Sequence, residues 1–392
     1  MASVILSAVR TPIGSFGGSL KSVPAPTLGA ISIRGALRKA RVQPEQVEEV
    51  MMGNVLTAGV GQAPARQAAL KAGLPKAVAC MTINKVCGSG MKAIMLADQG
   101  IRAGDFKLAV AGGQESMSNA PYLLDKARFG YRLGHGQTID HIYRDGLEDA
   151  YEHVLMGEVA DRCAAACQVP RELQDEFAIE SYKRAQKAIE EGLFKEETVG
   201  VTIKGRKGEE IVVEQDEEPF RTNFDKIPRL RPVFTAEGTV TAANASKIND
   251  GGAALVIADE AYAREMGFEP MARIVAQASH SHDPLDFPRA PIPAIQKVLD
   301  KAGMTLDDID LFEINEAFAV VALVAHKELG IPLEKLNIHG GAVALGHPIG
   351  ASGARIVVTL LHALKHHDLK TGLAAICIGG GEATALIVER LT

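Results

Sequence analysis

The chain has 392 residues, of which 47% are apolar and 23% charged, a composition that excludes a disordered chain and suggests two or three domains. Its formal charge of −6 argues against a general nucleic-acid binder, and no apolar run reaches the ~20 residues of a membrane span. Trp is absent and aromatic residues make up 5%, so we predict an aliphatic core without base-stacking platforms.

Strand-like and helix-like segments alternate from the start of the chain. The pattern predicts strands at residues 4–9, 50–55, 77–83 and 106–111, and helices at 27–39, 62–71 and 88–103. This alternation is typical of a mixed or parallel sheet covered by helices.

The middle of the chain, from about residue 119 to 248, is richer in charge and in polar turns. It contains a strong helix pattern over residues 158–191 that Pro170 is expected to kink or break. We interpret this region as an insertion on the surface of the core, because strand and helix patterns resume from residue 253.

The second half of the chain repeats motifs of the first. Asn54, Ser89 and Glu115 match Asn315, Ser352 and Glu382, at separations of 261, 263 and 267 residues. Three matches in the same order, at nearly constant separation, indicate a duplication with an insertion in the first copy. Two like halves would bring equivalent loops around a shared centre, where a cleft is expected.

The five cysteines are widely spaced, odd in number and without a C-x-x-C pair, which argues against a disulfide framework or a structural zinc site. The first residues do not resemble a secretory signal, so we expect a reducing cytoplasm. We interpret Cys80, Cys163 and Cys167 as packing residues.

Cys87 stands in the segment 84–90, between a predicted strand and a predicted helix. A helix N-terminus favours thiolate, and the neighbouring glycines free backbone N–H groups that can face an oxyanion. From the residues alone two interpretations stay open, namely a catalytic nucleophile and a buried cysteine in a tight turn.

His347 lies in the glycine-dense segment 340–350 before another predicted helix. Gly346-His347-Pro348 stands where a phosphate loop needs Gly-Lys-Ser/Thr, so we reject that motif. A histidine held among small residues suits a general base, and an exposed loop histidine is the alternative.

Cys377 ends the last strong strand pattern and precedes Gly379-Gly380-Gly381, another stretch with free N–H groups. Asn315 follows a strand-like segment and precedes a helix pattern. It is either the N-cap of that helix or the holder of a water or polar substrate group.

Together these blocks make the chain resemble the thiolase family, from residue 9 to the last strand. The resemblance implies an α/β fold with two duplicated βαβαβαββ halves in a layered αβαβα core and an inserted loop domain. We place the N-terminal half at residues 1–118 plus 250–271, the CoA-binding loop domain at 119–249 and the C-terminal half at 272–392.

The resemblance also implies an activity and roles for five residues. Thiolases cleave 3-ketoacyl-CoA with CoA, or condense two acyl-CoA molecules, by way of an acyl-cysteine. Cys87 would carry the acyl group and His347 would activate it. Cys377 would take or return the proton of the acetyl carbon. His347 and a water on Asn315 would form one oxyanion hole, and the N–H groups of Cys87 and Gly379 the other.

Five further residues are expected to contact the CoA substrate by resemblance: Met156, Arg221, Ser246, Phe287 and Phe318. Arg221 has an equally good interpretation as a solvated surface charge. Three positions depart from the family pattern: Leu155, which would alter the pocket wall, Lys247, which would add a cation near the ligand, and Glu382. The carboxylate of Glu382 is expected either to start a helix or to perturb Cys377.

Residues 286–291 resemble the acetoacetyl-CoA thiolases of the mitochondrial type, which implies conversion of two acetyl-CoA to acetoacetyl-CoA and the reverse. Members of that type respond to potassium. If this extends to the present chain, the ion would be lined by Tyr182, Ala242, Ala243, Ala245 and Val343. No metal or redox cofactor is needed for the chemistry itself.

We expect acyl-CoA substrates and a homotetramer or homodimer, with no nucleic-acid or membrane partner. The alternatives are a thiolase of fatty-acid degradation with a broader chain-length range and a non-catalytic acyl-CoA-binding homologue. A decarboxylating ketoacyl synthase is disfavoured because such enzymes lack the second cysteine, Cys377.

Overall fold

The structure is a computed structural model that describes residues 2–205 and 207–392. Its main sheet has ten strands in the order β12-β13-β14-β11-β1-β10-β5-β3-β4, with β2 paired to β10. These strands are β1 (Ser3–Arg10), β2 (Gly14–Ser15), β3 (Glu49–Gly53), β4 (Ala79–Ile83), β5 (Leu108–Ser116), β10 (Asn249–Asp259), β11 (Ala272–Ser281), β12 (Leu311–Ile314), β13 (Thr371–Ile378) and β14 (Glu382–Arg390).

The sheet is the sum of two halves that join at one narrow contact. Strands β1 and β11 pair only at Val4 with Arg273 and at Ile5 with Ala272. The halves are packed with helices α1 (Ala25–Ala40), α2 (Pro64–Lys71), α3 (Ser89–Ala103), α6 (Glu260–Glu265), α7 (Pro291–Ala302), α8 (Ala319–Leu329), α9 (Ala342–Leu345) and α10 (Ile349–His366).

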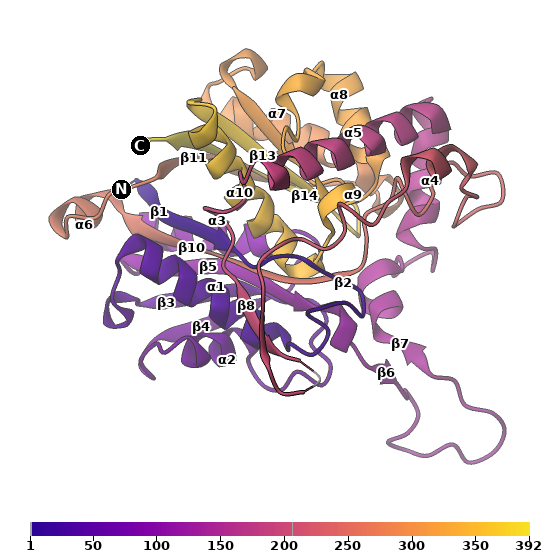
Figure 1. Ribbon diagram of the computed structural model, residues 1–392, viewed down its shortest axis with the longest axis horizontal. Helices are drawn as coiled ribbons and strands as arrows, with labels where there is room; N and C mark the ends of the chain where they lie inside the picture. The colour runs from indigo at the N-terminus through magenta and orange to yellow at the C-terminus, as the bar shows by residue number, and fades with distance from the viewer. Residues whose placement is uncertain (1, 206) are drawn as a thin grey trace.

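Helices α3 and α10 lie between the halves, where they contact each other and strands of both sides (Figure 1). Helices α1 and α2 cover the outer face of the first half, and α7 and α8 cover the outer face of the second. This arrangement confirms the predicted αβαβα layers. Buried aliphatic side chains fill the spaces between layers, as the composition predicts.

The second half departs from the repeat at one place. Between α8 and α10 there is no strand equivalent to β4, and its place in the parallel pairing is taken by a single bridge between Phe312 and Leu336. The second half, which carries His347, therefore lacks one strand of the repeated unit.

Strand β5 is longer than the predicted 106–111 because it runs straight through Gly112 and Gly113 to Ser116. A Cβ at Gly113 would overlap the carbonyl oxygen of Gly350, at the start of α10. These glycines therefore let α10 approach the sheet of the first half closely, which brings the two halves' loops together.

The inserted region holds two helices, α4 (Met156–Ala166) and α5 (Arg171–Glu190), which are separated at Pro170 as predicted. It also contains the strand pairs β6 (Tyr122–Leu123) with β7 (Ile139–Asp140) and β8 (Val201–Lys204) with β9 (Glu210–Val213), and short helical turns at Tyr143–Leu147 and Phe224–Arg229. Figure 1 shows the chain between β6 and β7 as an arm that extends away from the body. The predicted domain boundaries stay a prediction.

One buried ion cluster fastens this insertion to the core. Arg10, at the end of β1, is fully buried, and its guanidinium contacts Asp216 at 2.7 and 2.9 Å and Glu197 at 2.5 Å. Both carboxylates belong to the inserted region. Within the described residues, no helix is long and apolar enough to cross a membrane.

Candidate active site

Cys87 and His347 occupy equivalent positions, each two residues before a central helix. Cys87 precedes α3 and His347 precedes α10. Val86 turns the chain into α3 with a positive φ of 43°, and a Cβ at the next glycine, Gly88, would overlap the side chain of Ile378. The turn around Cys87 therefore packs directly against the end of β13 in the other half.

These two residues line one cavity of about 210 Å³ together with most of the predicted substrate contacts. The lining includes Cys87, His347, Gly379, Met156, Ser246, Phe287 and Phe318, and also Leu155 and Lys247. Cys377 and Asn315 are fully buried and precede the lining residues Gly379 and Ala317 by two positions. Arg221 is exposed and is not among the lining residues.

The backbone N–H groups of Gly379 and of Cys87 itself favour the thiolate form of Cys87. Burial raises the pKa of this thiol to about 11, against the lowering effect of these two donors. The thiol is therefore protonated at neutral pH and needs a base. The same two N–H groups are the ones that the family resemblance assigns to the acyl-enzyme oxyanion hole.

His347 is buried and firmly oriented, so the alternative of an exposed loop histidine is wrong. Its Nδ1 lies 2.5 Å from Oγ of Ser352, and its backbone N–H donates to Asn249 at 2.9 Å. The Ser352 hydroxyl donates its only proton to the Pro348 carbonyl, at 3.0 Å, so it accepts a hydrogen from Nδ1.

This tautomer leaves Nε2 of His347 with a lone pair. Nε2 is buried and has no hydrogen-bond partner among the described residues. Burial, with a smaller effect of the Arg355 charge, lowers the pKa of His347 to about 3. The ring is therefore neutral at physiological pH, in the form that can accept a proton.

Cys377, at the end of β13, is fully buried. Burial raises its thiol pKa well above the usual value, and negative charge on Cys87 raises it further. The Cys377 thiol is therefore protonated at neutral pH, as the Cys87 thiol is.

Asn315 follows β12 and is fully buried. The N-cap of α8 is Phe318, so the interpretation of Asn315 as a helix cap is wrong. Neither Oδ1 nor Nδ2 of Asn315 has a hydrogen-bond partner in the part of the chain that the structure describes. A buried amide in this state points to a water or a ligand as its partner.

The apolar wall of the cavity is built from three aromatic rings. Phe318 contacts Phe287 and Phe234, with ring centroids 6.4 and 6.2 Å apart. Phe234 can lie there because its neighbour on α4 is Gly157, where a Cβ would overlap the ring. Phe234 was not among the predicted site residues, because a single aromatic residue in a polar stretch carries no signal of its own.

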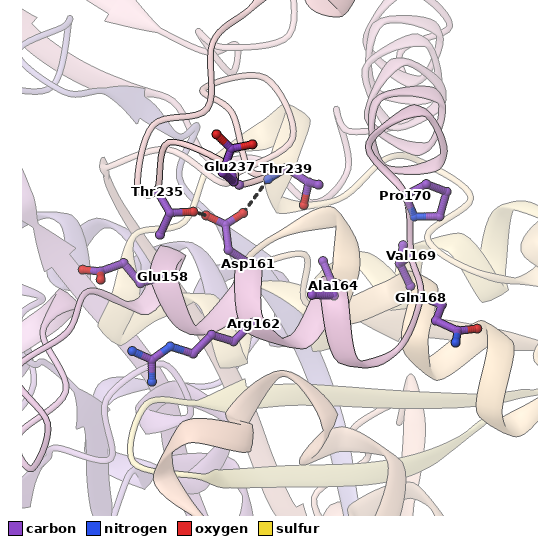
Figure 2. Close-up of a pocket in the computed structure, with 12 residues that line it drawn as sticks. Glu158, Asp161, Arg162, Ala164, Gln168, Val169, Pro170, Thr235, Glu237 and Thr239 are labelled. Carbon is purple, nitrogen blue, oxygen red and sulfur yellow. Dashed lines mark hydrogen bonds between the residues drawn. The ribbon is translucent and has the colours of Figure 1, made fainter.

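A second cavity, of about 640 Å³, lies on α4 and holds none of the predicted residues (Figure 2). Its most connected side chain is Asp161, which accepts hydrogen bonds from the Thr235 hydroxyl and from the N–H groups of Thr239 and Val240. Asp161 therefore fixes the loop that carries Phe234.

Glu382 is the first residue of β14, so the expectation that it starts a helix is wrong. Its carboxylate pairs with Lys85 and accepts a hydrogen bond from Ser281, and these contacts lower its pKa against the effect of burial. The pair joins the segment before Cys87 to the segment after Cys377.

Three of the five residues expected around potassium come together, but around a different cation. Nζ of Lys247 donates to the carbonyls of Ala245, at 2.8 Å, and Val343, at 3.1 Å. It also lies 5.4 Å from the centroid of the Tyr182 ring. The other two residues, Ala242 and Ala243, lie in the turn just before Ala245. An ammonium therefore already holds carbonyls that a bound ion would need.

The fold and the cavity together define a class of α/β protein, in which two similar halves meet around a cavity that a cysteine and a histidine line. A family model described as "Thiolase, N-terminal domain" matches residues 3–261, and one described as "Thiolase, C-terminal domain" matches residues 268–390. Since the two models span nearly all of the sequence, the chain belongs to the thiolase family, and the predicted resemblance is confirmed.

Individual relatives agree with the family. An acetyl-CoA acetyltransferase of Escherichia coli is 53% identical over 390 residues, and one of Cupriavidus necator is 52% identical over 388; each alignment covers 99% of both chains. The crystal structure of the Bacillus anthracis acetyl-CoA acetyltransferase matches with a TM-score of 0.97 at 44% identity, covering 100% of this chain and 99% of that one.

Proposed function

We propose that this chain is an acetyl-CoA acetyltransferase, which condenses two acetyl-CoA to acetoacetyl-CoA and CoA and catalyses the reverse thiolysis. The observation that carries the proposal is the cavity lined by both Cys87, whose thiolate two backbone N–H groups favour, and a neutral His347 whose Nε2 has no hydrogen-bond partner among the described residues. The names of the full-length relatives support the same activity.

In the first half-reaction, Nε2 of His347 takes the proton of the Cys87 thiol, and the sulfur attacks the thioester carbonyl. The N–H groups of Cys87 and Gly379 receive the developing oxyanion. CoA then leaves as a thiolate that takes the proton back from His347. The product is acetyl-Cys87 with every other group restored.

In the second half-reaction, the Cys377 thiol gives its proton to Nε2 of His347, and the resulting thiolate removes a proton from the methyl group of a second acetyl-CoA. The Nε2 hydrogen of His347 and a water held by Asn315 stabilise the enolate oxygen. The carbanion attacks acetyl-Cys87, the carbon–carbon bond forms and the sulfur of Cys87 leaves as a thiolate. This thiolate takes the proton from His347, so both thiols and the neutral histidine are restored.

The size of the cavity supports a short acyl group. At about 210 Å³ it falls below the range of roughly 300–1,000 Å³ that accommodates drug-sized ligands, and aromatic rings form part of its wall. We therefore propose a preference for acetoacetyl-CoA over longer ketoacyl-CoA substrates. In the same proposal, Arg221 contacts the nucleotide end of CoA at the surface.

The test is thiolysis of acetoacetyl-CoA, followed through the absorbance of its magnesium enolate. We expect CoA-dependent loss of the enolate, and an intact mass that shows one acetyl group on Cys87 when CoA is omitted. A series of ketoacyl-CoA chain lengths tests the size preference. Absence of cleavage by pure, folded protein would exclude the activity, and tight CoA binding without turnover would favour the non-catalytic alternative.

We also propose that the protein is a homotetramer or homodimer in a reducing, cytoplasmic compartment. Support comes from β4, the outer strand of the sheet, whose Met81 is 46% exposed, and from the arm between β6 and β7, where Phe129 and Leu133 are 88% and 99% exposed. All five cysteines are free thiols. Light scattering after gel filtration measures the number of chains.

A further inference from the structure

Lys247 lies between the two segments that shape the active site. Its neighbour Ser246 lines the cavity and donates its N–H to Ala317, and the next residue, Ile248, forms a β-bridge with His347. The Lys247 side chain then reaches α9, whose Val343 carbonyl accepts from its ammonium at 3.1 Å. The lysine thus ties the Ser246 segment to the helix that leads into His347.

The peptide of Val343 is held from both sides. Its N–H donates to the buried carboxylate of Glu316 at 3.1 Å, and its carbonyl faces the Lys247 ammonium. Glu316 also accepts from Ser181, the neighbour of Tyr182 on α5. Three segments that are distant in sequence are therefore fixed around one positive charge.

The surroundings of this ammonium are those of a cation site. Besides the two carbonyls it has the π face of Tyr182, which is fully buried and whose hydroxyl has no partner among residues 2–205 and 207–392. No carboxylate forms an ion pair with Lys247 in the described part of the chain. The charge is stabilised by dipoles and by an aromatic ring, as a bound monovalent ion would be.

We propose that Lys247 is a built-in cation that positions the Ser246 and His347 segments, so that this chain needs no potassium for activity. The inference rests on the proposed function for its activity assay. A potassium ion at the same carbonyls would displace the ammonium or lie beside a like charge, which disfavours its binding. Lys247 is a positioning residue, because its ammonium acts through Ser246 and His347.

The first test compares salts on the unaltered protein. Thiolysis and the melting temperature are measured in potassium chloride and in choline chloride at equal ionic strength. We expect equal kcat/KM and equal melting temperatures in the two salts. A kcat/KM several-fold higher in potassium chloride would overturn the proposal.

The second test removes the charge in two ways. Lys247→Ala leaves room for an ion, whereas Lys247→Met keeps most of the side chain's volume and fills that room. In choline chloride we expect both variants to lose roughly tenfold in kcat/KM, with KM raised, because two charge-assisted hydrogen bonds are lost. Potassium or ammonium chloride should restore Lys247→Ala and raise its melting temperature, and should leave Lys247→Met unchanged.

The matched control is Lys183→Ala, which removes an exposed lysine from α5 beside Tyr182 and should behave as the unaltered protein in every salt. Wild-type kcat/KM of Lys247→Ala in choline chloride, or equal rescue of both variants, would overturn the proposal. The ion-dependent melting temperature needs no turnover, so it still decides the matter if the proposed activity fails.

Discussion

The two halves of the core carry an asparagine at the same place, after β3 and after β12, and use it differently. Asn54 donates to Glu115 at 2.7 Å and accepts from Gln114, whereas Asn315 is equally buried with no partner among the described residues. The repeat therefore delivers the same residue to both sides of the centre. The Asn54 side chain is used in hydrogen bonds that hold the fold together, whereas the Asn315 side chain is left available to a ligand.

The serines that follow show the same division. Ser89 accepts from Lys85 and donates to Val86, and so shapes the turn that presents Cys87. Ser352, its equivalent, accepts from the ring of His347 and fixes the tautomer. Duplication gives two similar turns before two similar helices, and the identity of one residue in each turn separates nucleophile from base.

The largest expected effect is the loss of turnover in variants of the two cysteines, which should differ in whether they still form the acetyl-enzyme. Cys87→Ala should lower turnover by more than about 10³-fold and abolish the acetyl-enzyme, because no other described thiol lines the cavity. Cys377→Ala should lower condensation by a similar factor and still form acetyl-Cys87. Intact-mass spectra after exposure to acetyl-CoA measure acetyl-enzyme formation in both variants, and an acetyl-enzyme in Cys87→Ala would reverse the roles.

The next effect concerns the two asparagines, since one substitution should lower kcat and the other should lower the stability of the fold. Asn315→Ala should lower kcat by about 10²-fold with little change in melting temperature, since its amide has no described partner to lose. Asn54→Ala should destabilise the fold by about 1–3 kcal/mol, because it leaves the buried Glu115 short of a donor. Steady-state kinetics and thermal unfolding of both variants check this, and equal effects would contradict the comparison.

A smaller effect concerns Ser352. Ser352→Ala removes the acceptor that holds the Nδ1 hydrogen of His347, so kcat should fall by roughly 10- to 100-fold with KM unchanged. Ser32→Ala, which removes another buried hydroxyl from α1, is the control and should retain wild-type kinetics. Full activity of Ser352→Ala would show that catalysis does not depend on the Ser352 hydroxyl holding the Nδ1 hydrogen of His347.

The smallest effect concerns the matched carboxylates Glu115 and Glu382. Burial raises the pKa of Glu115 to about 7 from 4.5, so its stabilisation is present below about pH 4.5 and is lost as pH rises through 7. The Glu382 pKa is lowered, so its stabilisation is present above 4.5 and lost as pH falls. Melting temperatures relative to Glu115→Gln and Glu382→Gln should therefore change with pH in opposite directions.

Residue type and periodicity sufficed for a sheet covered by helices, the duplication and the junctions that hold Cys87 and His347, whereas the αβαβα layers came from the resemblance to the thiolase family. They did not reveal that β5 continues through Gly113, since that depends on the close approach of α10. They also did not decide the roles of Asn315 and Lys247, because whether a buried polar group has a partner depends on residues distant in sequence. Ser352 was visible in the repeat, but its contact with His347 was not.

The buried cluster at Arg10 has a consequence for how this chain can be altered. A deletion or exchange that removes Glu197 and Asp216 would leave the Arg10 guanidinium buried without a counter-charge. This would destabilise the fold by about 3–5 kcal/mol. The inserted region therefore cannot be replaced by that of another protein while β1, which ends at Arg10, is left unchanged. Residue 10 and the residues that neutralise it must change together, in evolution as in the laboratory.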